Sequence, residues 1–155
     1  SMLNDFKNKN YEVLLVTGRN NYEKTSNIEF PKNVKVVPYI ENMGEVLKVT
    51  DLIITRAGAT IISEITALGL PSILIPSPYV ANNHQYINAK DLENNEAALI
   101  IEEKSFDKDE LISKIDSILN DSKTYHKMTL ATKKMGITDS ATRIYKEIKK
   151  LCEGD

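Results

Sequence analysis

Residues 51–69 read Asp-Leu-Ile-Ile-Thr-Arg-Ala-Gly-Ala-Thr-Ile-Ile-Ser-Glu-Ile-Thr-Ala-Leu-Gly, which predicts a strand, a turn and a helix in that order. The apolar, β-branched run at 52–55 is typical of a buried strand. The pattern at 59–68 is helical, and the helix ends at Gly69 because Pro71 prevents it from continuing. In such a unit the free N–H groups of the helix start face the end of the strand, so this segment predicts an anion-binding site.

Glu64 lies one turn behind this helix start and shares a helix face with Thr60, four residues earlier. In nucleotide-binding α/β folds, a carboxylate near the phosphate-binding turn accepts hydrogen bonds from ribose hydroxyls. The same carboxylate could equally be a solvated charge near the positive end of the helix dipole. From this segment alone, both interpretations of Glu64 are open.

Two further segments extend the α/β pattern. Residues 71–78 (Pro-Ser-Ile-Leu-Ile-Pro-Ser-Pro) predict a second buried strand closed by prolines, and 79–89 predict a polar loop that opens a helix. The remaining predicted strands are 11–17, 34–38 and 97–101, and the predicted helices are a helix tail at 2–8 and 20–27, 43–49, 84–93, 107–119, 121–135 and 138–151. Because strands alternate with helices, we expect an α/β fold with a Rossmann-like, doubly wound parallel sheet, in a single domain over 1–155.

The last three predicted helices are extra to that sheet. Asp107 has the side chain and the position of an N-cap for the first of them. Apolar residues recur at helical spacing in the other two, and these are expected to face the core. They are Leu130, Ile144, Ile148 and Leu151.

The composition is that of an ordinary globular chain of 155 residues, 41% of them hydrophobic. A net charge of −2 gives no electrostatic reason to expect nucleic acid or a polybasic membrane anchor. One cysteine excludes an internal disulfide and fits a reducing, cytoplasmic compartment. No apolar run approaches the roughly 20 residues that span a bilayer, and the polar amino-terminal residues predict no signal peptide.

Five short motifs carry a resemblance to a known family. They are Arg-Ala-Gly-Ala-Thr at 56–60, Ser-Glu at 63–64, Ala-Leu-Gly-Leu-Pro at 67–71, Ile-Pro-Ser-Pro-Tyr at 75–79 and His-Gln-Tyr-Ile-Asn-Ala at 84–89. In order and spacing they resemble the carboxy-terminal, UDP-sugar donor-binding domain of the MurG family of GT-B glycosyltransferases, which is family 28-like. The resemblance covers nearly the whole chain and is densest over 34–92.

The resemblance implies a hexosyltransferase of peptidoglycan synthesis. It would move N-acetylglucosamine from UDP-N-acetylglucosamine onto the undecaprenyl-linked muramyl pentapeptide, the lipid I to lipid II step. Full-length members of the family would be peripheral on the cytoplasmic face of the cell membrane. No cofactor is implied.

The resemblance also implies where the nucleotide lies. The backbone of Ile40 would contact the uracil, with Met43 against the ring, and Glu64 would hold the ribose hydroxyls. Its chemistry suits this role, because one carboxylate can accept from two donors at once. The helix-start residues that would face the diphosphate and the sugar are Gly58, Ala59, Thr60 and Ile61.

The sugar-reading residues follow in the next helix. His84 and Gln85 match the polar pair that reads hydroxyls of N-acetylglucosamine in the family, and Asn88 follows one turn later. Taken alone, His84 would be an exposed loop histidine. Arg56 would either assist the diphosphate or pair with a neighbouring carboxylate. Ile61 departs from the family, which usually has a hydroxyl residue there, and the loss of that side-chain hydrogen bond is worth about 1 kcal/mol.

The implied mechanism is direct displacement at the anomeric carbon with inversion. Helix-start N–H groups would stabilise the charge that develops on the departing UDP, and a base in another domain would deprotonate the acceptor hydroxyl. No catalytic acid or base is assigned to this chain. No metal-ligand cluster is visible, because His84 and His126 are far apart in sequence and Cys152 stands alone.

This chain departs from the pattern of the family at its amino terminus. In the family, the donor domain opens with a strand and a glycine-rich loop that have no counterpart before Met2. That strand would lie at the sheet centre, so its absence leaves a gap, a new pairing between the strands at Val13 and Leu52, or an edge filled by a second copy as a homodimer. The acceptor domain is also absent, so the chain by itself is expected to be inactive.

Two other functions remain open from the sequence. The chain could be the donor-binding subunit of another UDP-sugar transferase that works with a separate acceptor-binding chain. It could also be a nucleotide-binding or protein-interaction module without chemistry, because a doubly wound sheet hosts many functions. The last predicts no preference for UDP-N-acetylglucosamine over other nucleotides.

Overall fold

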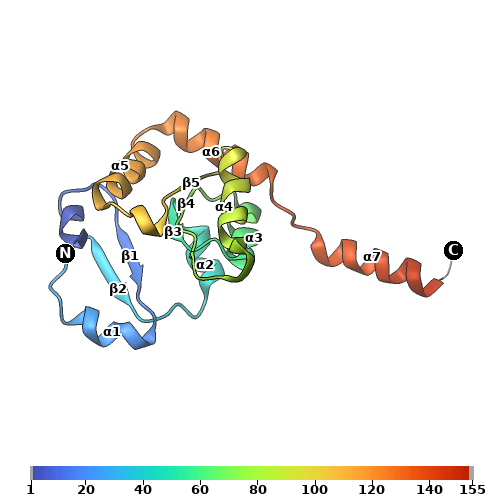
Figure 1. The fold of residues 1–155 in the computed structure, drawn as a ribbon, viewed down its shortest axis with the longest axis horizontal. Helices are drawn as coiled ribbons and strands as arrows, with labels where there is room; N and C mark the ends of the chain where they lie inside the picture. Colours follow the sequence, from blue (N-terminus) through green and yellow to red (C-terminus); the bar gives the residue numbers. More distant parts are fainter. Residues whose placement is uncertain (1, 154–155) are drawn as a thin grey trace. The chain divides into compact units, whose positions relative to one another are not determined.

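The computed structural model describes residues 2–153 and divides into two compact units, 1–45 and 46–155. The first unit contains the 3₁₀ helix η1 (Met2–Phe6), strand β1 (Val13–Val16), helix α1 (Arg19–Ser26) and strand β2 (Val34–Val37). Helix α2 (Met43–Lys48) spans the division. In the first unit β1 and β2 pair in parallel, with Val13 opposite Val34 (Figure 1).

The second unit is built on a three-stranded parallel sheet in the order β3-β4-β5. Its elements are β3 (Ile53–Thr55), α3 (Ala59–Leu68), β4 (Ser72–Leu74), η2 (Ala81–Asn83), α4 (His84–Asn94), β5 (Ala98–Ile100), η3 (Glu103–Ser105), α5 (Lys108–Leu119), α6 (Ser122–Lys134) and α7 (Ser140–Glu153). Helix α3 packs against α6, and α4 packs against β5 (Figure 1). This is the mixed α/β fold with parallel sheets and flanking helices that the alternating pattern predicts.

The bounds of α3 agree with the sequence prediction. Gly58 is its N-cap with an extended backbone, and Gly69 ends it in the left-handed conformation at φ 71°. Such a φ carries a steric cost for any residue with a Cβ, so glycine is the favoured residue at this C-cap. The cap predicted for α5 is also confirmed, because the Asp107 side chain accepts hydrogen bonds from the N–H groups of Asp109 and Glu110.

The core of the second unit lies around β4, the central strand, whose three residues are all buried. The large side chains that are almost fully buried include Ile65, Ile73, Leu74, Leu92, Ile101 and Ile118. The strand is shorter than the run 71–78 that predicts it. The N–H of Ile75 still donates to the carbonyl of Thr55, but Pro76 has no N–H with which to continue the ladder.

One expectation about packing is wrong. Leu130, Ile144, Ile148 and Leu151 are not core residues, because between 54% and 85% of their surface is exposed. In α7, no residue described is buried, so its apolar stripe has no partner in residues 2–153. The postulated pairing between the strands at Val13 and Leu52 stays a prediction, because β1 belongs to the first unit and β3 to the second, and each strand is described only within the sheet of its own unit. The homodimer stays a prediction.

Candidate functional site

The candidate site lies at the carboxyl edge of the three-stranded sheet. Because β3, β4 and β5 are parallel, the loops that follow them, at 56–58, 75–80 and 101–102, emerge at the same edge. In open α/β sheets, ligands bind in the crevice outside the carboxyl ends of the strands. The start of α3 and the start of α4 both follow loops from this edge, so they are the elements that can present polar groups there.

The start of α3 has free hydrogen-bond donors. The first hydrogen bond of the helix runs from the N–H of Ile62 to the carbonyl of Gly58, at 3.1 Å. The N–H groups of Ala59, Thr60 and Ile61 therefore have no partner inside the helix, and Gly58 supplies no side-chain cap. The space in front of Gly58 is open, because a Cβ there would meet nothing within 4 Å. This helix start can donate to an anion.

The side chains around the α3 start are accessible to differing degrees. Thr60 and Glu64 are exposed, and Ile61 is half-buried. The Glu64 carboxylate makes no hydrogen bond or ion pair with any residue of the described part of the chain. It can therefore accept from two ligand hydroxyls without first losing a protein partner.

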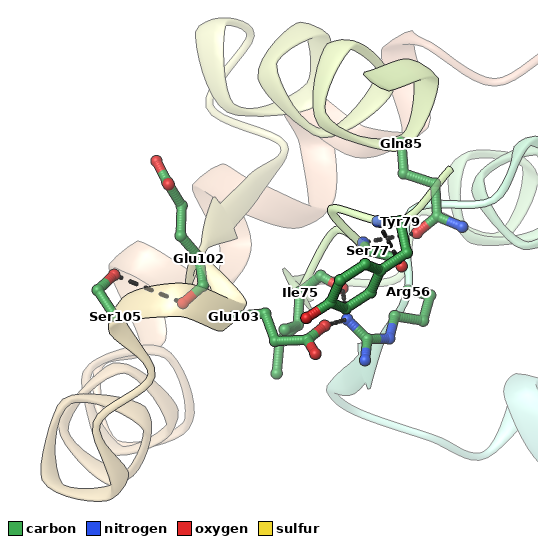
Figure 2. A network of polar contacts seen from close by, with 8 residues as sticks. All are labelled: Arg56, Ile75, Ser77, Tyr79, Gln85, Glu102, Glu103 and Ser105. Atoms are coloured by element: carbon green, nitrogen blue, oxygen red, sulfur yellow. Dashed lines mark hydrogen bonds and ion pairs between the residues drawn. The ribbon is translucent and has the colours of Figure 1, made fainter. Parts of the chain in front are cut away.

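Arg56, in the loop after β3, contacts the loop after β4 and the short helix η3 that follows β5. Its guanidinium Nη1 donates to the carbonyl of Ile75 at 3.1 Å and pairs with the carboxylate of Glu103 (Figure 2). Of the two roles expected for Arg56, pairing with a neighbouring carboxylate is the one observed. Half of the Arg56 side chain remains exposed, and its use on a diphosphate stays a prediction.

The start of α4 is held by a tight polar loop. Asn82 and Asn83 both have left-handed backbone conformations, at φ 53° and 52°. The His84 ring then packs back on this loop, with Nδ1 2.8 Å from the carbonyl of Ala81. Because a carbonyl oxygen only accepts, Nδ1 carries a hydrogen, and in the neutral ring Nε2 is then the acceptor.

Gln85 and Asn88 are tied to two different loops. The Oε1 of Gln85 accepts from the N–H of Ser77 at 2.9 Å, which leaves its NH₂ group to donate elsewhere (Figure 2). The Nδ2 of Asn88 donates to the carbonyl of Ala57 at 3.1 Å. Sequence reasoning missed both contacts, because the partner in each case is a backbone atom and leaves no signal in the pattern of side chains.

Ile40 and Met43, the predicted uracil contacts, belong to the first compact unit. Ile40 follows β2, Met43 begins α2, and both side chains are half-buried. The other predicted site residues all belong to the second unit, and all lie on the loop after β3, on α3 or on α4.

A shallow hollow of about 200 Å³ lies between the loops after β4 and β5. Its lining includes Ser77, Tyr86 and the run Glu102, Glu103 and Lys104. Pockets for drug-sized ligands have volumes of about 300–1,000 Å³, so this hollow is not by itself a nucleotide pocket. Among residues 2–153, no group of three or more His, Cys, Asp or Glu side chains could hold a metal ion.

Comparison with known proteins decides the family. The family described as "Glycosyltransferase family 28 C-terminal domain" matches residues 1–144 of this chain. The chain belongs to this glycosyltransferase family. It is 47% identical over 153 residues to the UDP-N-acetylglucosamine–N-acetylmuramyl-(pentapeptide) pyrophosphoryl-undecaprenol N-acetylglucosamine transferase of Bacillus cytotoxicus. It is 45% identical over 155 residues to the enzyme of the same name from Bacillus licheniformis.

The chain spans less than half the length of these relatives. The alignments take in 96% and 97% of this chain but only 42% of each relative. The crystal structure of Acinetobacter baumannii MurG superposes with a TM-score of 0.79 at 25% identity, over 90% of this chain and 41% of that one. The glycosyltransferase VinC in complex with dTDP gives a TM-score of 0.70 at 16% identity, over 86% and 32%, which shows the shared fold.

One observation bears on the membrane. No helix within the described range 2–153 is long and apolar enough to cross a bilayer.

Proposed function

We propose that this chain is the donor-binding domain of a transferase that moves N-acetylglucosamine from UDP-N-acetylglucosamine onto the lipid-linked muramyl pentapeptide, converting lipid I to lipid II. The names of the relatives that are 45–47% identical support the substrates. The observation that carries the proposal is the uncapped start of α3 at the carboxyl edge of the sheet, with the unpartnered Glu64 carboxylate one turn behind it.

Each part of the donor has a proposed contact in this chain. The N–H groups of Ala59, Thr60 and Ile61 bind the diphosphate, where the helix dipole adds to their hydrogen bonds. Glu64 accepts from the ribose hydroxyls. Ile40 and Met43 contact the uracil; His84, Gln85 and Asn88 lie on the sugar side; Gly58 leaves room for the diphosphate and Arg56 adds positive charge.

The protein contacts of Gln85 and His84 decide which hydrogen-bonding group each side chain can offer to the sugar. Gln85 keeps its NH₂ free, so it donates to a sugar oxygen, whereas His84 offers Nε2 as an acceptor to a sugar hydroxyl. A sugar with one hydroxyl inverted or missing would leave one of these groups unpaired. Such unpaired groups are the usual source of sugar discrimination.

The proposed reaction is an inverting displacement, and this chain stabilises the leaving group. As the bond to the anomeric carbon breaks, negative charge builds up on the β-phosphate of UDP, and N–H groups fixed in the direction of that charge lower the barrier. The base and the acceptor site are proposed to lie in sequence that the relatives have beyond the matched 42%. The chain alone therefore binds the donor without turnover. Because undecaprenol is a membrane lipid, the complete enzyme would work at the cytoplasmic membrane face.

Calorimetric titration of the chain tests this proposal. UDP-N-acetylglucosamine, UDP-glucose and UDP are titrated into the wild type, into Glu64→Ala, and into Glu147→Ala as a control at another exposed helical glutamate. We expect a preference for the N-acetylated sugar and a loss of at least about tenfold in affinity for all three ligands in Glu64→Ala only, since hydrogen bonds to a charged group are worth about 1.5–3 kcal/mol. ADP is titrated into the wild type as a comparison nucleotide. Equal binding of ADP and the three uridine ligands would contradict the proposal and favour a general nucleotide-binding module.

A further inference from the structure

Asn88 makes the only hydrogen bond described to the carbonyl of Ala57, in the loop that precedes α3. It is a half-buried residue of α4, and its Nδ2 donates to the carbonyl of Ala57 at 3.1 Å. Ala57 is fully buried and stands immediately before Gly58, the N-cap of α3. Within residues 2–153, no other hydrogen bond to this carbonyl is present.

The position of this hydrogen bond matters because Gly58 itself restricts the backbone of the loop little. Gly58 has no Cβ to restrict its backbone, and no side chain caps the helix there. The peptide group between Ala57 and Gly58 is planar, so fixing the Ala57 carbonyl also fixes the direction of the Gly58 N–H. The Gly58 carbonyl in turn accepts the first hydrogen bond of α3, from Ile62. The direction of the free N–H groups at the helix start therefore depends on how firmly Ala57 is held.

Gln85 and Asn88 play different parts although they share a helix face three residues apart. Gln85 binds the loop after β4 through its oxygen, so its NH₂ donor remains free. Asn88 uses one hydrogen of its Nδ2 on the buried carbonyl of Ala57, so its side chain is directed to the loop, and the second hydrogen and Oδ1 remain. Of the two amides, Gln85 therefore keeps both hydrogens of its NH₂ group for a ligand, whereas Asn88 donates to the loop.

We infer that Asn88 is a positioning residue that orients the diphosphate-binding start of α3, rather than a contact to the sugar. The inference rests on the proposed function, because it concerns the same donor site. It replaces the sugar-side role that position in the helix alone suggests for Asn88. The two roles differ in which part of the donor loses affinity when Asn88 is changed.

Binding of three ligands of increasing size separates these roles. Uridine, UDP and UDP-N-acetylglucosamine are titrated by NMR into the wild-type chain, Asn88→Ala and the isosteric Asn88→Asp, which loses the donor. Asn94→Ala, an exposed position on the same helix, is the matched control. We expect the affinities for UDP and UDP-N-acetylglucosamine to fall by the same factor, about fivefold in Asn88→Ala, with uridine binding unchanged. A loss confined to UDP-N-acetylglucosamine, or no loss at all, would overturn the inference.

A second readout needs no ligand. Amide hydrogen exchange of a peptide covering 56–62 should be faster in both Asn88 variants than in the wild type and in Asn94→Ala, while exchange in α5 stays the same. Unchanged exchange at 56–62 would overturn the positioning role. If the wild type binds neither UDP nor UDP-N-acetylglucosamine, the proposed function fails. The hydrogen-exchange result then still decides whether Asn88 holds the loop.

Discussion

Gly136, in the segment after α6, lies against the backbone of α3. A Cβ built on Gly136 would be 2.4 Å from the carbonyl oxygen of Thr66 and 3.1 Å from the Cα of Ala67, both in α3. The Thr66 carbonyl also accepts from the N–H of Gly69, so it takes part in the helix C-cap. Both obstacles are backbone atoms, which cannot rotate away as the end of a flexible side chain could. We predict that Gly136→Ala destabilises the fold.

The size of the effect follows from the distances. Ordinary contacts begin at 3.4 Å, so the two backbones must separate by about 1 Å to admit the new methyl group. Overpacking of this kind costs about 1–3 kcal/mol. For a chain of this length, each kcal/mol lowers Tm by about 2–4 °C, so the expected fall is roughly 2 to 12 °C.

Thermal unfolding followed by circular dichroism measures this prediction. The matched control is Gly44→Ala in α2, where a Cβ would meet nothing within 4 Å and helix propensity favours alanine by up to about 1 kcal/mol. The control should unfold at the wild-type temperature or above it. A Gly136→Ala variant as stable as the wild type would show that α3 and the segment after α6 are not packed as described.

Two further predictions concern buried and capping groups. Thr132 is fully buried, and its hydroxyl lies 2.9 Å from the carbonyl of Ala97, the residue before β5. Thr132→Val should therefore lower the free energy of unfolding by about 1–3 kcal/mol in urea titrations. Ser72→Ala removes a buried hydroxyl that has no hydrogen-bond partner in the described part of the chain, and it should change that free energy little. The hydrogen bond from the Thr124 hydroxyl lowers the pKa of the Asp121 carboxyl. The free energy of unfolding of the wild type should therefore exceed that of Asp121→Asn by its full amount above the unperturbed pKa of 3.8, and this difference should disappear as the pH falls through the lowered pKa. A constant difference from pH 7 to pH 2 would contradict the prediction.

Much of the fold of this chain could be predicted because its signals are local. The bounds of α3, the Gly69 stop and the Asp107 cap depend on residues within a few positions of each other, and all three are observed. The apolar stripe of α7 misled the prediction, since periodicity shows that a face is apolar and not whether a partner covers it.

The candidate site could be predicted only in part. The order strand, turn, helix predicts that Gly58, Glu64 and Gln85 lie on elements that start at one edge of the sheet, and the structure has them there. The roles of Arg56 and Asn88 depend on contacts with a residue or backbone group more than 15 positions away. A sequence pattern holds no information about such a partner when the partner is a carbonyl group, which every residue has. These contacts became visible only in the folded chain.

The central claim is that the Glu64 carboxylate holds the ribose of a uridine nucleotide bound at the start of α3. A double-mutant cycle tests it most directly: UDP and 2′,3′-dideoxy-UDP are titrated into the wild type and into Glu64→Ala. We predict that the wild type loses about tenfold or more in affinity when the ribose hydroxyls are removed, and that Glu64→Ala binds both nucleotides equally, a coupling within the range of about 0.5–3 kcal/mol for contacting groups. If the hydroxyls contribute the same affinity in both proteins, Glu64 does not contact the ribose and the account of the site is wrong.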